Sequence, residues 1–391
     1  RLTKQEVRKT AIRYARDGFE THPFLWGEIF IQAHMIGRTP EGREIYMPEN
    51  AIPRPGDMLY QKRAADTLER LVEEGNDYFY HGDLAEKLVQ TVKEAGGVLT
   101  REDLERYEVR WQEPAWGTYR GHKIAGSPPP DNGGTHIIEM LNMVELLDLQ
   151  RLGPPTDSGE TLLQMVNISN EVKRAGARQN DPLSHPLPLE TIVSKDYAKM
   201  RFDLLQMGMP QDNGESGANP PVGSNHVTVV DADGNVATIL HSCMSYPWSN
   251  GLFVEGISIC AAGAHFNRVM PKPGHRISAY IAPNILFQDD KPILASGSPS
   301  VSLLQNILQN TVNILDFGIP IEESVHRPRF GDRSFTVPGS SIIEADIDER
   351  VREKAEMKGV RFDVVNPWNW HNGAFEGIYI DPSNGSRKAC G

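Results

Sequence analysis

The stretch Gly223-Ser224-Asn225-His226-Val227-Thr228-Val229-Val230-Asp231 lies where the character of the sequence changes. The preceding residues, 211–223, are rich in glycine, proline and asparagine and almost free of apolar side chains, which is typical of an exposed loop. From Val227 onward the apolar residues follow a strand-like pattern, and a turn containing Gly234 leads to a second apolar run at 236–240. The pattern predicts a β-hairpin that begins directly after a loop.

The composition is that of a globular protein, and it narrows the possible functions. The chain has 391 residues, of which 39% are hydrophobic, and a formal net charge of -12. Such an acidic chain is poorly suited to nucleic acid or anionic membranes, and no segment approaches the ~18 unbroken apolar residues of a membrane span. The cysteines, Cys243, Cys260 and Cys390, exclude a disulfide scaffold and lack zinc-ligand spacing. We therefore expect no metal and no cofactor.

The first half of the chain is predicted to be mainly helical, and the second half to contain the hairpin and further strands. We interpret Asp83 with Glu86, and Thr100 with Asp103, as helix caps, and the pair Gly133-Gly134 as part of a flexible connector. The predicted division is a mostly helical part, 1–210, an exposed loop, 211–223, and a sheet-rich part, 224–391. The expected helices cover 61–75, 83–95, 137–149, 160–178 and 302–317, and the expected further strands cover 252–260, 283–287 and 292–296.

Ser224 is the strongest candidate for a catalytic nucleophile in this sequence. If the chain is cut between Gly223 and Ser224, the serine hydroxyl can attack a carbonyl while its own α-amine, with a pKa of about 8, accepts the proton. No phosphate loop, His-Glu-x-x-His motif or Gly-x-Ser-x-Gly elbow competes with this interpretation. The residues alone leave open the simpler alternative, in which Ser224 is only the first residue of a strand.

Several further stretches, together with 224–231, resemble the γ-glutamyltransferase (γ-glutamyltranspeptidase) family of N-terminal-nucleophile hydrolases. They follow the family's order and spacing from about residue 55 to the C-terminus. Family members normally carry, before these motifs, an N-terminal part with core strands and an arginine that binds the substrate carboxylate, which the present sequence does not show. The motifs are Ala64-Ala65-Asp66-Thr67-Leu68, Pro128-Pro129-Pro130-Asp131-Asn132-Gly133-Gly134, Gly297-Ser298-Pro299, Arg327-Pro328-Arg329-Phe330, Gly373-Ala374-Phe375-Glu376-Gly377-Ile378, and residues 75–82, 96–104 and 119–121.

The resemblance implies an α+β fold, namely a four-layer αββα sandwich of the N-terminal-nucleophile hydrolase type. It also implies self-cleavage at Gly223-Ser224 into large and small subunits of one precursor. Ser224 corresponds to the catalytic threonine of the family, and Asn225 and His226 to the next two motif positions. We expect His226 to support the nucleophile structurally rather than to act as a base. Ser242 corresponds to a threonine that hydrogen-bonds the nucleophile.

The resemblance also locates an oxyanion hole. Ser300 and Val301 replace the paired glycines whose N–H groups form this hole in the family. Backbone donors need no particular side chain, so the hole can still form. The β-branched Val301 nevertheless excludes the freer conformations that glycine adopts.

The residues that would recognise a glutamyl group have changed. Met244 stands in place of an asparagine, His265 in place of an acidic residue, and Ala279-Tyr280 in place of the serine pair that binds the carboxylate. A glutamyl head carries two charges, and each needs a fixed partner in a dry pocket. We therefore expect a substrate with a bulkier, more aromatic or less charged acyl group.

The main functional hypothesis is cleavage of an amide or related acyl bond in a small molecule through an acyl-Ser224 intermediate, by hydrolysis or acyl transfer. The alternatives are γ-glutamyl transfer or hydrolysis of glutathione, hydrolysis of a C–C bond in a biosynthetic pathway, and a non-catalytic homologue that keeps the fold. No secretory signal peptide is recognisable, and the sequence leaves the cellular compartment open.

Overall fold

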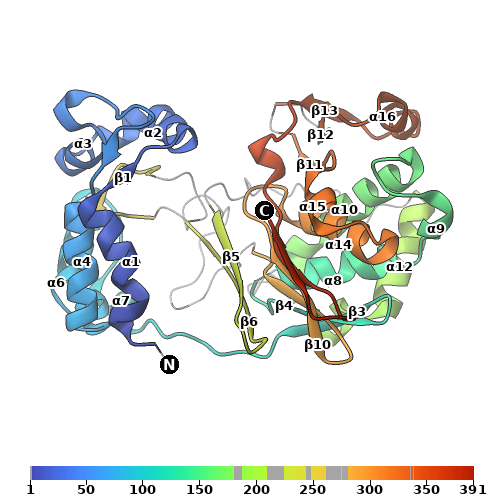
Figure 1. The fold of residues 1–391 in the computed structure, drawn as a ribbon, viewed down its shortest axis with the longest axis horizontal. Helices are drawn as coiled ribbons and strands as arrows, with labels where there is room; N and C mark the ends of the chain where they lie inside the picture. Colours follow the sequence, from blue (N-terminus) through green and yellow to red (C-terminus); the bar gives the residue numbers. More distant parts are fainter. Residues whose placement is uncertain are drawn as a thin grey trace. The chain divides into compact units, whose positions relative to one another are not determined.

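The computed structural model of the protein describes residues 2–131, 133–179, 187–208, 224–243, 248–260, 274, 281–334, 336–337 and 339–391. The described residues belong to two units, one formed by residues up to 111 together with 248–260, and the other by the rest (Figure 1). The predicted loop at 211–223 lies outside the described residues, and the division of the chain at residue 224 stays a prediction.

The first unit is helical, with two short two-stranded ribbons, β1–β2 and β7–β8. Its largest apolar cluster is built around Ile29, Ile36 and Leu59, which are almost fully buried. In chain order the elements are α1 (Lys4–Asp17), β1 (Phe19–Glu20), α2 (Pro23–Ile36), α3 (Pro40–Tyr46), the 3-10 turn η1 (Pro48–Asn50), β2 (Met58–Leu59), α4 (Lys62–Glu73), α5 (Asp77–Tyr80), α6 (Asp83–Glu94), α7 (Arg101–Glu105), β7 (Phe253–Val254) and β8 (Ile257–Ser258).

The second unit contains the main sheet, whose strand order is β15-β14-β10-β9-β4-β3 with antiparallel neighbours throughout. Its strands are β3 (Ala115–Tyr119), β4 (His122–Gly126), β9 (Asn284–Gln288), β10 (Lys291–Gly297), β14 (Glu376–Ile380) and β15 (Arg387–Cys390). A hairpin of β5 (Ser224–Val230) and β6 (Val236–Ser242) and a three-stranded sheet of β11 (Phe330–Arg333), β12 (Ser341–Glu344) and β13 (Phe362–Val365) complete the strands of this unit.

The helices of the second unit surround a large apolar core. They are α8 (Gly133–Val144), α9 (Leu149–Leu152), α10 (Gly159–Gln179), α11 (Leu189–Ile192), α12 (Lys195–Gln206), α14 (Leu303–Phe317), α15 (Ile321–His326), α16 (Glu349–Glu356) and the 3-10 turn η2 (Trp370–Asn372).

The main sheet is covered on both faces. The β5–β6 hairpin packs against β10 and β14, whereas α8 and α14 lie on the opposite side (Figure 1). Residues 293–297 of β10 are buried in succession, which requires cover on both faces because successive strand side chains point in opposite directions. The unit thus contains a helical layer and two facing sheets, in keeping with the α+β sandwich expected from the sequence.

Two local predictions need correction, and one hairpin was missed. The pair Gly133-Gly134 is not a flexible connector: it opens α8, and a Cβ on Gly134 would lie 2.2 Å from the backbone nitrogen of Ser127. The residue before α6 is Gly82, and Asp83 lies in the first turn, where its carboxylate pairs with Arg70 at 3.2 Å instead of capping the helix. The β3–β4 hairpin was not predicted. The expected cap at Thr100 with Asp103 is confirmed.

A buried ion cluster joins the helices of the second unit. Arg201 of α12 pairs with Glu139 of α8 and, at 3.1 Å, with Glu171 of α10, and all three side chains are at most 1% exposed. The Arg201 guanidinium also donates to the Glu171 backbone carbonyl at 2.8 Å. Burial raises the pKa of the Glu139 carboxyl to about 7 even with the arginine beside it. The arginine therefore offsets a large part of the free-energy cost of removing the glutamate carboxylates from water.

Replacing Arg201 by leucine should lower the free energy of unfolding by about 3–5 kcal/mol, because the two glutamates would remain buried without a cation. The loss should be smaller at about pH 5 than at about pH 8, since a buried carboxyl group can become neutral by protonation. Denaturant titration of the full chain measures both values. Lys199→Leu, an exposed position on the same helix, is the control and should cost less than about 1 kcal/mol. Equal losses in the two variants would contradict this role.

Candidate active site

The β5–β6 hairpin brings two serine hydroxyls together. Ser224 is the first residue of β5 and is paired in register with Ser242, the last residue of β6. The Ser224 hydroxyl donates a hydrogen bond to the Ser242 hydroxyl at 2.9 Å. Asn225 is exposed and is opposite His241 in the register. Because side chains alternate along a strand, Asn225 faces away from the side shared by Ser224 and His226.

His226 lies where the hairpin meets the main sheet. It is 4% exposed, and its Nε2 is 2.7 Å from the hydroxyl of Thr238 on β6. Its Nδ1 is 3.4 Å from a carboxylate oxygen of Glu376, the first residue of β14. A Cβ on Gly297 would lie 2.4 Å from the imidazole ring, so glycine at the end of β10 leaves the space that the ring fills. These contacts fix the ring between the two sheets, which suits a supporting role.

The loop that joins β10 to α14 contains the predicted oxyanion residues. Ser300 is 5% exposed and Val301 is completely buried. Ser300 has a φ of 77°, in the left-handed region that favours glycine, whereas Val301 is not among the described residues with positive φ. A non-glycine residue in this region carries a backbone strain of about 1–2 kcal/mol. The loop therefore keeps a glycine-like shape at Ser300.

Buried polar groups hold this loop at both ends. Asn306 Nδ2 donates to the hydroxyl of Ser298 at 3.2 Å, and the Ser298 hydroxyl donates to the Pro299 carbonyl at 3.0 Å. At the other end the backbone N–H of Ser302 donates to the His371 carbonyl at 3.2 Å. The Ser302 hydroxyl accepts from the backbone N–H of Asp332 at 2.9 Å.

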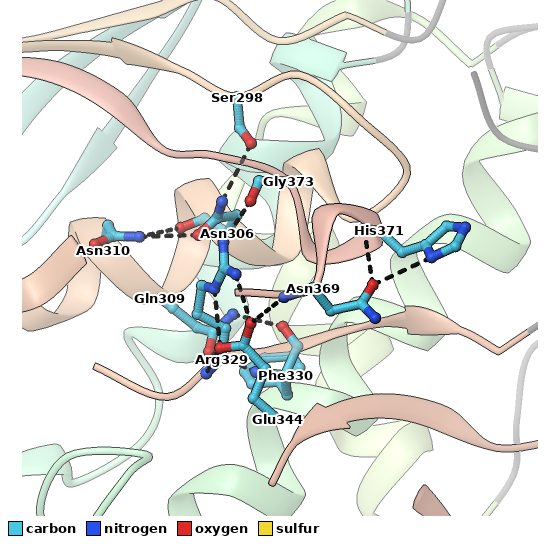
Figure 2. A network of polar contacts seen from close by, with 10 residues as sticks. All are labelled: Ser298, Asn306, Gln309, Asn310, Arg329, Phe330, Glu344, Asn369, His371 and Gly373. Atoms are coloured by element: carbon cyan, nitrogen blue, oxygen red, sulfur yellow. Dashed lines mark hydrogen bonds and ion pairs between the residues drawn. The ribbon is translucent and has the colours of Figure 1, made fainter. Parts of the chain in front are cut away.

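A second layer of contacts, drawn in Figure 2, holds the segment 369–373 against the loop. Arg329 and Glu344 form a buried ion pair, and the Arg329 guanidinium also donates to the Gly373 carbonyl. Glu344 in addition accepts from the backbone N–H of Asn369 at 3.1 Å. Gly373 has a φ of 78°, and a Cβ there would lie 2.6 Å from the Pro299 carbonyl oxygen. The glycine thus allows close backbone contact with the loop.

The structure brings some of the predicted site residues together and leaves others undescribed. Ser224 and Ser242 meet at one end of the hairpin, and His226, two residues along β5 from Ser224, lies against Gly297 at the beginning of the Gly297–Val301 loop. Their catalytic roles, and those of Ser300 and Val301, stay predictions. The residues that lie outside the described part of the chain are Gly223, Met244, His265, Ala279 and Tyr280.

Sequence analysis missed Asn306, Asn369 and Glu344 as supports of the loop. One signal was available, because Asn306, Asn310 and Asn313 recur at helical spacing among the apolar residues of 302–317. All three are buried in α14, and Ser324 bridges two of them: its hydroxyl donates to Asn310 Oδ1 at 2.7 Å and accepts from Asn313 at 3.1 Å. The sequence around Asn369 and Glu344 shows no comparable pattern.

Among the described residues, no group of three or more His, Cys, Asp or Glu side chains could hold a metal ion. Within the same residues, no helix combines the length and apolar character needed to cross a membrane.

Comparisons with known proteins identify the relatives of this chain. The gamma-glutamyltranspeptidase family model matches residues 1–390. The "Glutathione hydrolase proenzyme" of Escherichia coli (strain K12) is 29% identical over 405 residues, which cover 93% of this chain and 68% of that protein. The "Acylase ACY 1 proenzyme" of Pseudomonas sp. (strain SE83) is 30% identical over 374 residues, which cover 92% of this chain and 65% of that protein. The crystal structure of cephalosporin acylase from Bacillus halodurans has a TM-score of 0.83 and 25% identity, covering 100% of this chain and 72% of that chain.

The fold is therefore the α+β fold of the N-terminal-nucleophile hydrolases, and the chain is an enzyme of the hydrolase and acyltransferase type. The chain belongs to the gamma-glutamyltranspeptidase family. The family and the fold class expected from the sequence are both confirmed.

The strain at Ser300 can be tested by comparing two small substitutions. Ser300→Gly relieves the positive φ, whereas Ser300→Ala removes the same hydroxyl but keeps the Cβ. We expect the glycine variant to be more stable than the alanine variant by about 1 kcal/mol in thermal or denaturant unfolding. An alanine variant as stable as the glycine variant would show that the positive φ costs nothing at this position.

Proposed function

We propose that this chain is a self-processing enzyme that cleaves an amide or related acyl bond of a small molecule through an acyl-Ser224 intermediate. The observation that carries the proposal is the hydrogen bond of 2.9 Å between the Ser224 and Ser242 hydroxyls at the first residue of β5. This position suits a residue that becomes the N-terminus of a new chain. The relatives named above are proenzymes, which supports processing of this chain into two subunits.

Processing begins with attack of the Ser224 hydroxyl oxygen on the carbonyl carbon of Gly223. The peptide C–N bond breaks, the nitrogen of Ser224 takes up a proton, and an ester joins Gly223 to the serine oxygen. Water then hydrolyses the ester, which leaves a carboxylate on Gly223 and a free α-amine on Ser224. Ser242 orients the attacking hydroxyl through its hydrogen bond.

In the mature enzyme the α-amine of Ser224 accepts the hydroxyl proton as the oxygen attacks the substrate carbonyl. The tetrahedral oxyanion is stabilised by the backbone N–H groups of Ser300 and Val301. The leaving amine takes the proton, the acyl-serine forms, and water or an acceptor amine then releases the acyl group. The contacts of Ser298 and Ser302 support this step, because a loop held at both ends needs little reorganisation when charge develops.

The acyl group is proposed to lack the free α-amino acid head of a γ-glutamyl substrate. Met244, Ala279 and Tyr280 offer one hydroxyl and no formal charge to such a head, and His265 is cationic only when protonated. A relative at 30% identity is named an acylase, which supports cleavage of an acyl bond without specifying the acyl group. Glutathione hydrolysis is the second candidate, because a glutathione hydrolase proenzyme is 29% identical over most of the chain.

Ser224→Ala should abolish both self-cleavage and substrate turnover, since it removes the attacking oxygen. Ser224→Thr is the matched control, because threonine keeps a hydroxyl at the same atom, and it should still separate into two chains. Intact mass spectrometry of the full chain detects the cut, and circular dichroism confirms that both variants fold. Cleavage of the alanine variant at Gly223-Ser224 would refute the proposed chemistry.

Substrate preference can be measured with three p-nitroanilides that differ only in their acyl group. Glutaryl-p-nitroanilide lacks the α-amine of the γ-glutamyl compound, and butyryl-p-nitroanilide also lacks the distal carboxylate. We expect kcat/KM for the γ-glutamyl compound to be lower than that of the better of the other two by a factor on the order of a thousand, because its ammonium would be buried without a partner. Efficient turnover of the γ-glutamyl compound would favour the glutathione candidate while leaving the acyl-Ser224 mechanism intact.

A further inference from the structure

A pocket with a volume of about 330 Å³ lies in the second unit, apart from the β5–β6 hairpin. Its walls come from α10, from β11 and from the segments that precede β12 and β13. Among the described residues, none of the predicted catalytic or oxyanion residues lines it, although Asp332 of the lining also donates its backbone N–H to the Ser302 hydroxyl. A volume of this size is at the lower end of that found for small-ligand sites.

The lining is rich in cations although the chain as a whole is acidic. Lys173, Arg174, Arg333 and Arg361 line the pocket, and Asp332 is the one acidic residue among the described residues of the lining. Lys173 and Asp332 form an ion pair. The formal net charge of the chain is -12, so this local excess of positive charge is opposite to the average.

The acids that the structure describes near the lining also have other partners. Arg174 is 3.3 Å from Glu171, but Glu171 also pairs with Arg201, whose other partner is Glu139. Asp363 of β13 is close in sequence to Arg361 and accepts hydrogen bonds from the hydroxyls of Ser334 and Thr336, the latter at 2.7 Å.

Polar donors accompany the charges. The Nε of Arg174 is buried and has no hydrogen-bond partner among the described residues. The guanidinium of Arg361 extends over Gly339, where an added Cβ would lie 3.3 Å from one of its nitrogens. Ser340 and Ser341 are 2% and 4% exposed, and Asn170 Nδ2 donates to the Ser341 hydroxyl at 3.4 Å. The backbone N–H of Ser341 donates to the Arg361 carbonyl at 2.9 Å, which fixes this wall of the pocket.

We propose that this pocket binds a small anion that carries phosphate or carboxylate groups, with Arg361 and Arg174 as its principal contacts. Guanidinium groups match the geometry of both oxyanions and form charge-assisted hydrogen bonds with them. The buried serine hydroxyl groups and the asparagine amides of the wall supply neutral donors around the charged ones. The site does not depend on the proposed reaction at Ser224.

Titration calorimetry of the full chain at constant ionic strength tests the site, with inorganic phosphate in one arm and citrate in the other. We expect saturable binding of one anion per chain, and the arm with the tighter binding identifies the preferred oxyanion. Arg361→Gln should weaken this binding about tenfold, in line with the loss of one charge-assisted pair. Arg361 is exposed, so the variant should fold like the parent.

Arg350→Gln is the matched control, because Arg350 is an exposed arginine of α16 that does not line the pocket. Its affinity for the anion should equal that of the parent. Arg174→Lys, which keeps the charge but loses the guanidinium geometry, should give an intermediate loss. Absence of saturable binding in both arms, or equal affinity in the parent and Arg361→Gln, would overturn the proposal. An equal loss in Arg350→Gln would reduce the effect to the overall charge and would likewise overturn it.

Discussion

Residues 298–302 carry the chain from β10 into α14 through the protein interior, where each polar backbone and side-chain group needs a hydrogen-bond partner. The partners that hold the loop come from Asn306 of α14, from the His371 carbonyl and from the backbone N–H of Asp332 in β11. The adjoining helix and two segments that are distant in sequence, β11 and residues 369–373, therefore determine the shape of one short loop. The arrangement of α14, β11 and residues 369–373 follows from this requirement.

The loop is also connected to the apolar core. The side of α14 that carries Leu304, Ile307 and Leu308 belongs to the core cluster shared with α8 and the main sheet. The polar side of the same helix carries Asn306 and Asn310. Packing of the core therefore fixes the angle at which α14 leaves the loop, and the rigidity of the candidate site depends on residues that never approach a substrate.

Sequence periodicity predicted those elements whose position is set by their own residues and not by contacts with distant segments. The hairpin at 224–242 and the helix at 303–317 are found almost where the patterns indicated. Asp83 was misread because its motif is local, whereas its actual partner, Arg70, lies on another helix. Gly133-Gly134 was misread because a close approach to the backbone of Ser127 leaves no trace in the local sequence.

The residues of the candidate site also divide into those that a sequence pattern indicates and those that only the folded structure reveals. Ser224 and the positions aligned with it are predicted from the resemblance and from a strand that follows a loop, and their roles stay predictions. The supports of the Ser298–Ser302 loop were missed because Glu344 and Asn369 act through a buried ion pair and a backbone contact that only the folded chain creates. Nothing in the composition separates such a glutamate from the many exposed ones.

The amides of α14 constrain the order in which the second unit can assemble. The side-chain amide of Gln309 forms hydrogen bonds with the backbone of Phe330, 21 residues further along. The backbone N–H of Ser302 donates to the carbonyl of His371. If α14 packed onto the sheet before these partners arrived, each amide would lose its water at a cost of about 1–3 kcal/mol. Docking of α14 before these partners are in place is therefore energetically disfavoured. Any chemistry that depends on the shape of this loop therefore depends on a residue 69 positions further along the chain, His371.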